Sequence, residues 1–379
     1  MRIAFYAPMK PPTHGTPSGD RRVAGMYMDA LARAGHRVEL VSTFRSYDGT
    51  GDAARQEALR AQGIASGRAL AAQWRAAAPG ARPQLWFTYH VYHKAPDWIG
   101  PEASAALGIP YVIAEASHAT KRAQGKWALG HQGAEAAIRR AQLLLCPTRD
   151  DVAGLLPLAA DPSRVVWLPP FIDAQPFAAA RQARASHRAR FAARHDLDPA
   201  VPWISIAAMM RPGDKLASFR ALAATLARVA DLPWRLLVAG DGAARADTEA
   251  AFAAAVPGRA AFLGALRLEE VAALAAASDL CAWPAVNEAY GMALLEAAAA
   301  GVPAAACAVR GVPDVVQDGR TGLLAAPGDQ AGLAAQVRRL LQDVPLRESM
   351  GRAASAFAAG ERSVEAAARR LGELLPKAA

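Results

Sequence analysis

Two glutamates eight positions apart flank a glycine in the second half of the chain. Glu288 follows the strand-like run 280–283, and Glu296 lies in the alanine-rich helix that Gly291 opens. The first amides of a helix have no partner within it and carry partial positive charge, so they can hold a phosphate. We interpret this segment as an anion site in which Glu296 reaches a ribose diol and Glu288 accepts hydrogen bonds from a sugar. An ordinary amphipathic helix with Glu288 near its cap is the alternative.

Two cations follow the strand that the sequence predicts at 203–208. Arg211 and Lys215 stand on either side of a Pro-Gly turn. A planar guanidinium and a compact ammonium can together neutralise a diphosphate. The alternative is a solvated basic turn. Two glycines, Gly240 and Gly242, stand on either side of Asp241 after the strand predicted at 235–239. This segment either lines a nucleobase pocket or makes a tight turn.

The first half of the chain carries a second set of polar residues after its strands. Ser18, Gly19, Asp20 and Arg21 begin a helix after the first strand, where backbone amides can face an anion. N-capping by Ser18 or Asp20 is the alternative.

Four titratable residues lie at the ends of the strands predicted at 85–89 and 111–115. They are His90, His93, Glu115 and His118. Their positions place them at the carboxyl edge of a sheet, although a single histidine in a loop is more often incidental than catalytic. The acidic pair Asp196 and Asp198 stands at a helix end before a proline, so we interpret it as surface capping and expect no metal site.

The elements that must position these residues are short apolar runs separated by alanine-rich helical segments. Runs that are apolar on both faces are typical of parallel strands covered by helices. Twelve such runs are expected, six on each side of the proline-rich segment 168–173: 2–7, 37–42, 85–89, 111–115, 143–146, 165–168, 203–208, 235–239, 260–263, 280–283, 303–307 and 322–325. The pattern predicts an α/β protein of two doubly wound domains, with ligands between the carboxyl ends of the strands.

Composition narrows the class of protein. The 379 residues are 53% hydrophobic and 20% charged, which excludes general disorder. The three cysteines lie far apart, which argues against a disulfide framework and for a reducing, cytoplasmic setting. No apolar stretch of about 18 residues lacks a charge or a proline, so no membrane span is expected.

The net charge of +9 fits an anionic partner without selecting one. The basic residues are scattered without an aromatic platform, so nucleic acid is not expected. Lys121, Arg122, Lys126 and Trp127 form one basic-aromatic segment that could contact an anionic membrane surface. Solvated helix faces are the alternative.

Several of these motifs occur in one order that resembles a known family. The motifs that carry this resemblance are Glu288 to Glu296 with Tyr290-Gly291, the segment Asp318 to Leu324, Arg211 with Lys215, Gly240-Asp241-Gly242 and Gly35-His36-Arg37-Val38. Through them the chain resembles the retaining GT-B glycosyltransferases of family 4, the glycosyl transferases of group 1. The likeness covers nearly the whole chain and is strongest in the second half.

The resemblance implies a fold, a domain division and a reaction. The fold is GT-B, two Rossmann-like domains facing a central cleft, with a C-terminal helix that returns to the first domain. The acceptor domain spans 1–172 with 356–379, and the donor domain spans 173–355. The reaction moves a sugar from a nucleotide-diphosphate donor to an acceptor hydroxyl with retention and without a metal or other cofactor, in the synthesis of a surface polysaccharide, glycolipid or glycoconjugate.

The resemblance also implies roles for the site residues. The catalytic set is Glu288, Arg211, Lys215 and His118. The donor would contact Glu296, Gly291, Met292, Ala293, Leu294, Tyr290, Gly240, Asp241, Gly242, Ser18 and Gly19. Asp20, Arg21, His90, His93 and Glu115 would lie on the acceptor side.

The sequence departs from the family pattern in three places. The gap between Arg211 and Lys215 is short, and Leu216 follows Lys215 where glycine is common. The first loop has Ser18-Gly19 where Gly-Gly is common. The histidine expected at a set distance after Pro110 is replaced by Ala116, with His118 two positions later, which leaves the role of His118 open. Two other functions stay open: a sugar-nucleotide 2-epimerase of the same fold, and a non-catalytic nucleotide-sugar-binding partner of another transferase.

Overall fold

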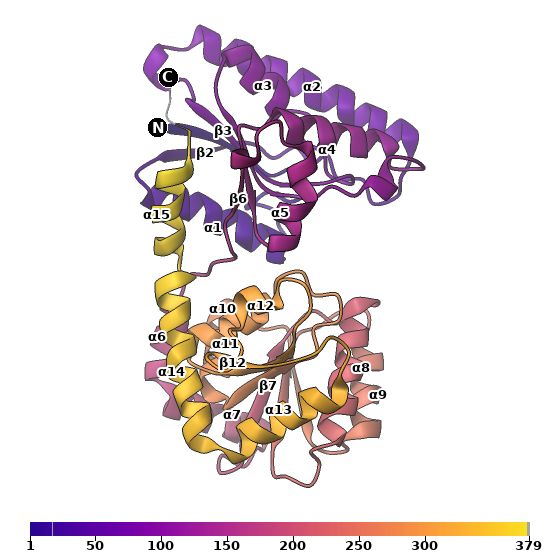
Figure 1. Ribbon diagram of the computed structural model, residues 1–379, viewed down its shortest axis with the longest axis vertical. Coiled ribbons are helices and arrows are strands. Elements are labelled where there is room, and N and C mark those ends of the chain that lie inside the picture. The colour runs from indigo at the N-terminus through magenta and orange to yellow at the C-terminus, as the bar shows by residue number, and fades with distance from the viewer. Residues whose placement is uncertain (17, 377–379) are drawn as a thin grey trace. The chain divides into compact units, whose positions relative to one another are not determined.

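The chain folds into two compact units, each a parallel sheet between layers of helices (Figure 1). The structure is a computed structural model that describes residues 1–16 and 18–376. Unit 1 comprises Met1–Pro169 and the segment from Val364 onward, and unit 2 comprises Pro170–Ser363. The functional domain limits expected from the sequence, 172/173 and 355/356, stay predictions.

Unit 1 is built on a six-stranded sheet in the order β2-β1-β3-β4-β5-β6. All its strand pairs are parallel, and the central strands are buried on both faces. Its strands are β1 Arg2–Tyr6, β2 Arg37–Ser42, β3 Leu85–Val91, β4 Tyr111–Ala116, β5 Leu143–Cys146 and β6 Val165–Trp167. Its helices are α1 Gly19–Arg33, α2 Ala53–Ala76, α3 Gly100–Leu107, α4 Ala128–Arg140, α5 Arg149–Leu155 and α15 Val364–Leu374, with single 3-10 turns η1 Pro79–Ala81, η2 Thr120–Arg122, η3 Leu156–Leu158 and η4 Pro162–Arg164.

Unit 2 repeats this design in the order β12-β11-β10-β7-β8-β9. Its strands are β7 Trp203–Ala207, β8 Arg235–Ala239, β9 Ala260–Gly264, β10 Leu280–Trp283, β11 Ala304–Cys307 and β12 Gly322–Ala325. Its helices are α6 Gln175–Gln182, α7 Arg184–His195, α8 Asp214–Ala227, α9 Arg245–Ala255, α10 Leu268–Ala277, α11 Met292–Ala299, α12 Val312–Val315, α13 Gln330–Gln342 and α14 Val344–Glu361. Alanine-rich helices such as α10 and α11 bury most of their residues.

The order of strands confirms the predicted class, two doubly wound Rossmann-like sheets. In each sheet the winding direction reverses at one point, between β1 and β3 in unit 1 and between β7 and β10 in unit 2. Ligands of such sheets bind outside the carboxyl ends of the strands at this reversal. The strand ends of β1, β3, β7 and β10 are therefore where a site is expected.

The C-terminal helix returns to unit 1, as the resemblance implied. Helix α15 packs along α1 (Figure 1), where Arg33 forms ion pairs with Glu365 and with Asp29, the latter at 3.0 Å. The sequence predicts one continuous helix over 346–375, and this prediction is wrong at Arg362 and Ser363. The carbonyl of Arg362 accepts a hydrogen bond from the Ile172 amide at 2.8 Å, which ends α14 before α15 begins. Residues 377–379 of the expected C-terminal segment lie outside the described residues.

Two other local expectations are corrected. Helices α6, α9 and α12 were not predicted as separate elements. The sequence predicts a helix that begins at Ser218, whereas α8 begins at Asp214, which places Lys215 in the first helical turn. Within residues 1–16 and 18–376, no helix combines the length and hydropathy needed to cross a membrane.

Gly240 offers a test of how the loops after β7 and β8 pack. Its φ is +140°, and a Cβ there would lie 1.9 Å from the Ala208 carbonyl oxygen. We expect Gly240→Ala to lower the free energy of unfolding of unit 2 by about 3 kcal/mol, since backbone strain and overpacking add. Gly258→Ala is the matched control, because its φ is +72° but nothing lies within 4 Å of the added carbon. It should cost about 1 kcal/mol. Equal losses in urea unfolding would contradict this account.

Candidate functional site

The site in unit 2 lies at the carboxyl ends of three adjacent strands. Strand β7 pairs with β10 on one side and with β8 on the other. The loops that leave these strands therefore start side by side. They carry the predicted donor-site residues Glu288, Arg211, Lys215 and Gly240–Gly242.

The structure brings two of the predicted catalytic residues into contact. Lys215 forms an ion pair through Nζ with Oε2 of Glu288. The indole Nε1 of Trp283 donates to the same oxygen at 3.2 Å, and Nζ of Lys215 lies 5.4 Å from the centroid of that ring. The Lys215 and Glu288 side chains remain 19% and 17% exposed, so a ligand can still reach them. An ammonium for phosphate and a carboxylate for sugar hydroxyls thus lie together.

The loop that carries Glu288 is held by α8. Oδ2 of Asp214 accepts a hydrogen bond from Nδ2 of Asn287 at 2.9 Å, and Oγ of Ser218 accepts one from the Val286 amide at 3.0 Å. Ala285 and Asn287 have φ values of +58° and +51°. Residues other than glycine adopt this region at a cost, and they do so where surrounding contacts fix the backbone. These contacts fix the position of Glu288.

Helix α11 begins at the reversal point, as the sequence predicts. Gly291 is its N-cap in the left-handed conformation, with φ +79° and ψ +48°. The Leu294 amide donates to the Gly291 carbonyl at 2.9 Å, so the first turn already uses one of the four amides expected to hold a diphosphate. A phosphate contact by Gly291, Met292 and Ala293 stays a prediction. Tyr290, immediately before the cap, is partly buried.

Glu296 lies deeper than Glu288. Its residue is only 8% exposed. Burial, together with the nearby charge of Glu296, raises the pKa of the Cys281 thiol to about 12. The Glu296 side chain is therefore largely shielded from solvent, and its contact with a ribose stays a prediction.

The remaining donor-side residues lie in the loops after β7 and β8. Arg211 is exposed in the loop between β7 and α8. Gly242 has φ +148°, and a Cβ there would lie 2.3 Å from the Met210 carbonyl oxygen. The Met210 amide donates to the Asp241 carbonyl at 2.9 Å, which holds the two loops together. The two loops pack so closely that only glycine fits at these positions. A nucleobase pocket there stays a prediction.

Unit 1 has its own cluster at its reversal point. Nδ1 of His90 lies 3.0 Å from Oδ1 of Asp20 and 3.6 Å from Oε1 of Glu115. Burial opposes the charged imidazole, but Glu115 and Asp20 outweigh it and raise the pKa of His90 above its ordinary value. His90 and Glu115 have φ values of +63° and +59°. Three of the five residues predicted on the acceptor side therefore form one polar cluster.

The other predicted residues of unit 1 have different partners. Ser18 is the N-cap of α1 and accepts a hydrogen bond from the Arg21 amide at 3.2 Å, while Gly19 is exposed. Nε of Arg21 donates to the Pro12 carbonyl at 3.0 Å. The ring of His93 packs edge-on against Trp127, with centroids 5.7 Å apart.

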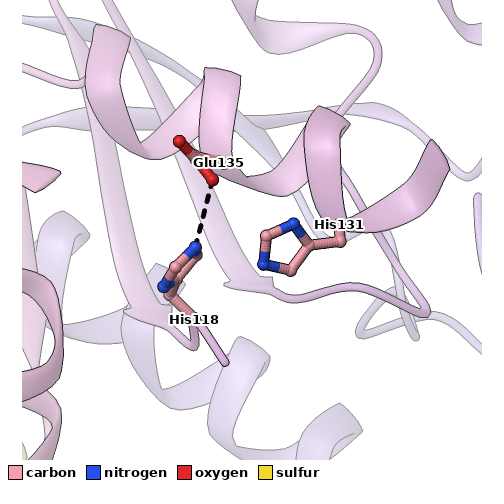
Figure 2. A group of neighbouring side chains, drawn as sticks. All are labelled: His118, His131 and Glu135. Carbon is pink, nitrogen blue, oxygen red and sulfur yellow. Dashed lines mark hydrogen bonds and ion pairs between the residues drawn. The ribbon is translucent and has the colours of Figure 1, made fainter. Parts of the chain in front are cut away.

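His118 has a third set of partners. It lies beside Glu135 and His131 of α4 (Figure 2). The catalytic role suggested for it stays a prediction.

Sequence reasoning missed four residues of these clusters. Trp283 and Asp214 orient the Glu288 segment, and their positions at a strand end and a helix start were the available signals. His131 and Glu135 lie four positions apart, a spacing that puts two side chains on one face of a helix.

Solved structures share this architecture over nearly the whole chain. Sucrose-phosphate synthase from Thermosynechococcus elongatus superposes with a TM-score of 0.76 at 20% identity, covering 98% of each chain. The Anabaena protein HepE, solved in complex with UDP-glucose, superposes with a TM-score of 0.68 at 16% identity, also covering 98% of each chain. These likenesses show the fold, and the chain has the GT-B fold.

Sequence comparison finds a family model and a relative that each match part of the chain. Residues 204–343 match the family model of the glycosyl transferases of group 1. The 2-deoxystreptamine glucosyltransferase of Streptomyces kanamyceticus is 30% identical over 267 residues, which span 64% of this chain and 64% of that relative. Residues 204–343, which lie in unit 2, are therefore similar to the group 1 glycosyl transferases.

The cluster in unit 1 gives a pH-dependent prediction. Because the pKa of folded His90 is raised, its contribution to the free energy of unfolding is complete below about pH 6.5 and is lost as pH rises through the folded pKa. Asp20→Asn and Glu115→Gln should each lower the His90 pKa. Each variant removes a negative charge that stabilises the charged ring, so the effect of burial, which lowers the pKa, is opposed less. The measurement is the His90 ring titration by NMR.

The matched control is Asp29→Asn, on the same helix, where Asp29 pairs with Arg33. It should leave the His90 pKa unchanged. An unchanged titration in both cluster variants would show that the carboxylates do not set this pKa.

Proposed function

We propose that this chain transfers a sugar with retention from a nucleotide-diphosphate donor to an acceptor hydroxyl. The contact between Lys215 and Glu288 at the reversal point of unit 2 carries the proposal. The family match over residues 204–343 supports it.

Positively charged groups would hold the diphosphate of the donor and stabilise the negative charge that develops on it. The bond between the anomeric carbon and the diphosphate oxygen breaks, and negative charge builds on the diphosphate. Lys215, Arg211 and the first amides of α11 lie at the strand ends where this charge would appear, and fixed positive groups aimed at such a charge lower the barrier. With these cations in place, the proposed reaction uses no metal at the diphosphate.

Glu288 would act on the sugar. As a carboxylate it accepts hydrogen bonds, and Trp283 and Lys215 orient one of its oxygens. When a diphosphate arrives, Lys215 can turn to it, and Glu288 is then released to bind donor hydroxyls. The acceptor oxygen would bond to the anomeric carbon on the face that the diphosphate leaves, and its proton would pass to a phosphate oxygen of the leaving group.

The acceptor would be a hydroxyl compound in the assembly of a polysaccharide, glycolipid or other glycoconjugate in the cytoplasm. On unit 1, we propose the Asp20–His90–Glu115 cluster as part of the acceptor side, since it lies at that unit's reversal point. Contact with an anionic membrane surface has one structural support. The cations of Lys94, Arg122 and Lys126 all lie within 5.4 Å of the Trp127 ring centroid.

The site assignment predicts the effect of two substitutions. Lys215→Ala and Glu288→Gln should each reduce transfer by about 100-fold, the usual loss when one stabilising group is removed from a transition state. Release of nucleoside diphosphate from UDP-, GDP- and ADP-sugars with a panel of hydroxyl acceptors measures it. Arg338→Ala, which removes an exposed ion pair with Asp231 of the same unit, is the control and should keep full activity.

Three results would decide against this proposal. Full activity in both site variants would overturn the site. An epimerised nucleotide sugar without acceptor would favour the 2-epimerase. Donor binding without turnover over the whole panel would favour the non-catalytic partner.

A further inference from the structure

A group of three potential metal ligands lies in unit 1, outside the proposed donor site. His118 follows β4, while His131 and Glu135 project from one face of α4 (Figure 2). In residues 1–16 and 18–376, this is the one group of three histidine, cysteine or carboxylate side chains with ligand atoms close enough to share an ion.

The geometry of the group approaches that of a tetrahedral site. One ligand atom from each residue lies within 4.8 Å of the other two. Nε2 of His118 lies 3.2 Å from Oε2 of Glu135, and the two imidazole centroids are 4.7 Å apart. Zinc bonds of about 2.0–2.2 Å place neighbouring ligand atoms about 3.4 Å apart. The His118–Glu135 edge already has this length, and a small rotation of the His131 ring would close the rest.

His131 supplies the second, independent observation. Its residue is 4% exposed, and its buried Nε2 has no hydrogen-bond partner among the described residues. A buried polar atom left without a partner costs about 1–3 kcal/mol, so its presence calls for a partner.

Arg139 fixes the carboxylate. Its Nε and Nη2 donate to Oε1 of Glu135 at 2.9 and 2.8 Å. The second oxygen, Oε2, is directed to His118. Arg139 thereby holds the carboxylate with one oxygen oriented toward the histidines.

We propose that His118, His131 and Glu135 bind one divalent transition-metal ion of the zinc class. Two imidazoles and one carboxylate suit zinc, whereas magnesium and calcium prefer sites made only of oxygen. Three protein ligands leave a fourth position for water or a substrate group. The site uses residues of unit 1 alone, is separate from the diphosphate contacts proposed above, and makes His118 a metal ligand rather than a catalytic residue.

Zinc titration of the full chain without an affinity tag tests the proposal. After removal of metals with a chelator, calorimetry in competition with a chelator of known affinity should show one equivalent of Zn²⁺ per chain. His131→Gln and Glu135→Gln should each weaken binding by about 100-fold or more, because loss of even an outer partner of a ligand costs about 10–100-fold. His187→Gln is the matched control, since His187 also has a buried unpartnered nitrogen but belongs to no such group.

Two further measurements keep the test decisive. Circular dichroism and thermal unfolding of the metal-free variants show whether they fold. If they do not, Co²⁺ added to the unaltered protein should give the intense visible bands of a tetrahedral ion. The proposal is overturned if Co²⁺ gives only the weak octahedral spectrum, or if both ligand variants bind Zn²⁺ like the control. His36 offers a competing site, because the N-terminal amine lies 3.4 Å from its Nδ1. Loss of binding in His36→Gln instead of the ligand variants would also overturn the proposal.

Discussion

The reversal of winding in each parallel sheet is the constraint on which both clusters depend. Adjacent strands whose connections run in opposite directions leave room at their carboxyl ends, and the loops that follow them meet there. In unit 2 this rule joins the loop after β10 to the start of α8, and so Glu288 to Lys215. In unit 1 it joins the start of α1 to the ends of β3 and β4, and so Asp20 to His90 and Glu115.

The unit 2 site combines a backbone segment held in place with an ion pair whose two charges can change partners. Hydrogen bonds from Asn287 and Val286 to α8 hold the segment that carries Glu288, and positive φ values at Ala285 and Asn287 show that the fold imposes its shape. The Lys215–Glu288 pair is different. Its side chains are only 19% and 17% exposed, and the cost of desolvating both charges offsets much of their attraction, so the pair contributes little net stability. Its two charges can therefore change partners without unfolding the loop.

The sequence predicts the strands better than the contacts between loops. All twelve strands lie where the apolar runs place them, because a strand buried on both faces needs such a run. Helix α9 was missed because no apolar stripe sets its alanine-rich segment apart, and α14 was joined to α15 because both segments favour helix. Asp20, His90 and Glu115 were predicted as strand-end residues, but their contact depends on strand order, which a single sequence does not show. The bonds of Trp283 and Asp214 depend on tertiary packing in the same way.

The central claim is that Lys215 binds the diphosphate and Glu288 binds the sugar of one donor. The most direct test measures the affinity of the unaltered protein, Lys215→Ala, Glu288→Gln and the double variant for a nucleoside diphosphate and for the matching nucleotide sugar. We expect Lys215→Ala to weaken both ligands by about 10-fold or more, the loss of a charged hydrogen bond. Glu288→Gln should weaken the nucleotide sugar and leave the bare diphosphate unchanged or tighter, since Lys215 is then free to meet it. Unchanged affinity for both ligands in both single variants would contradict the account.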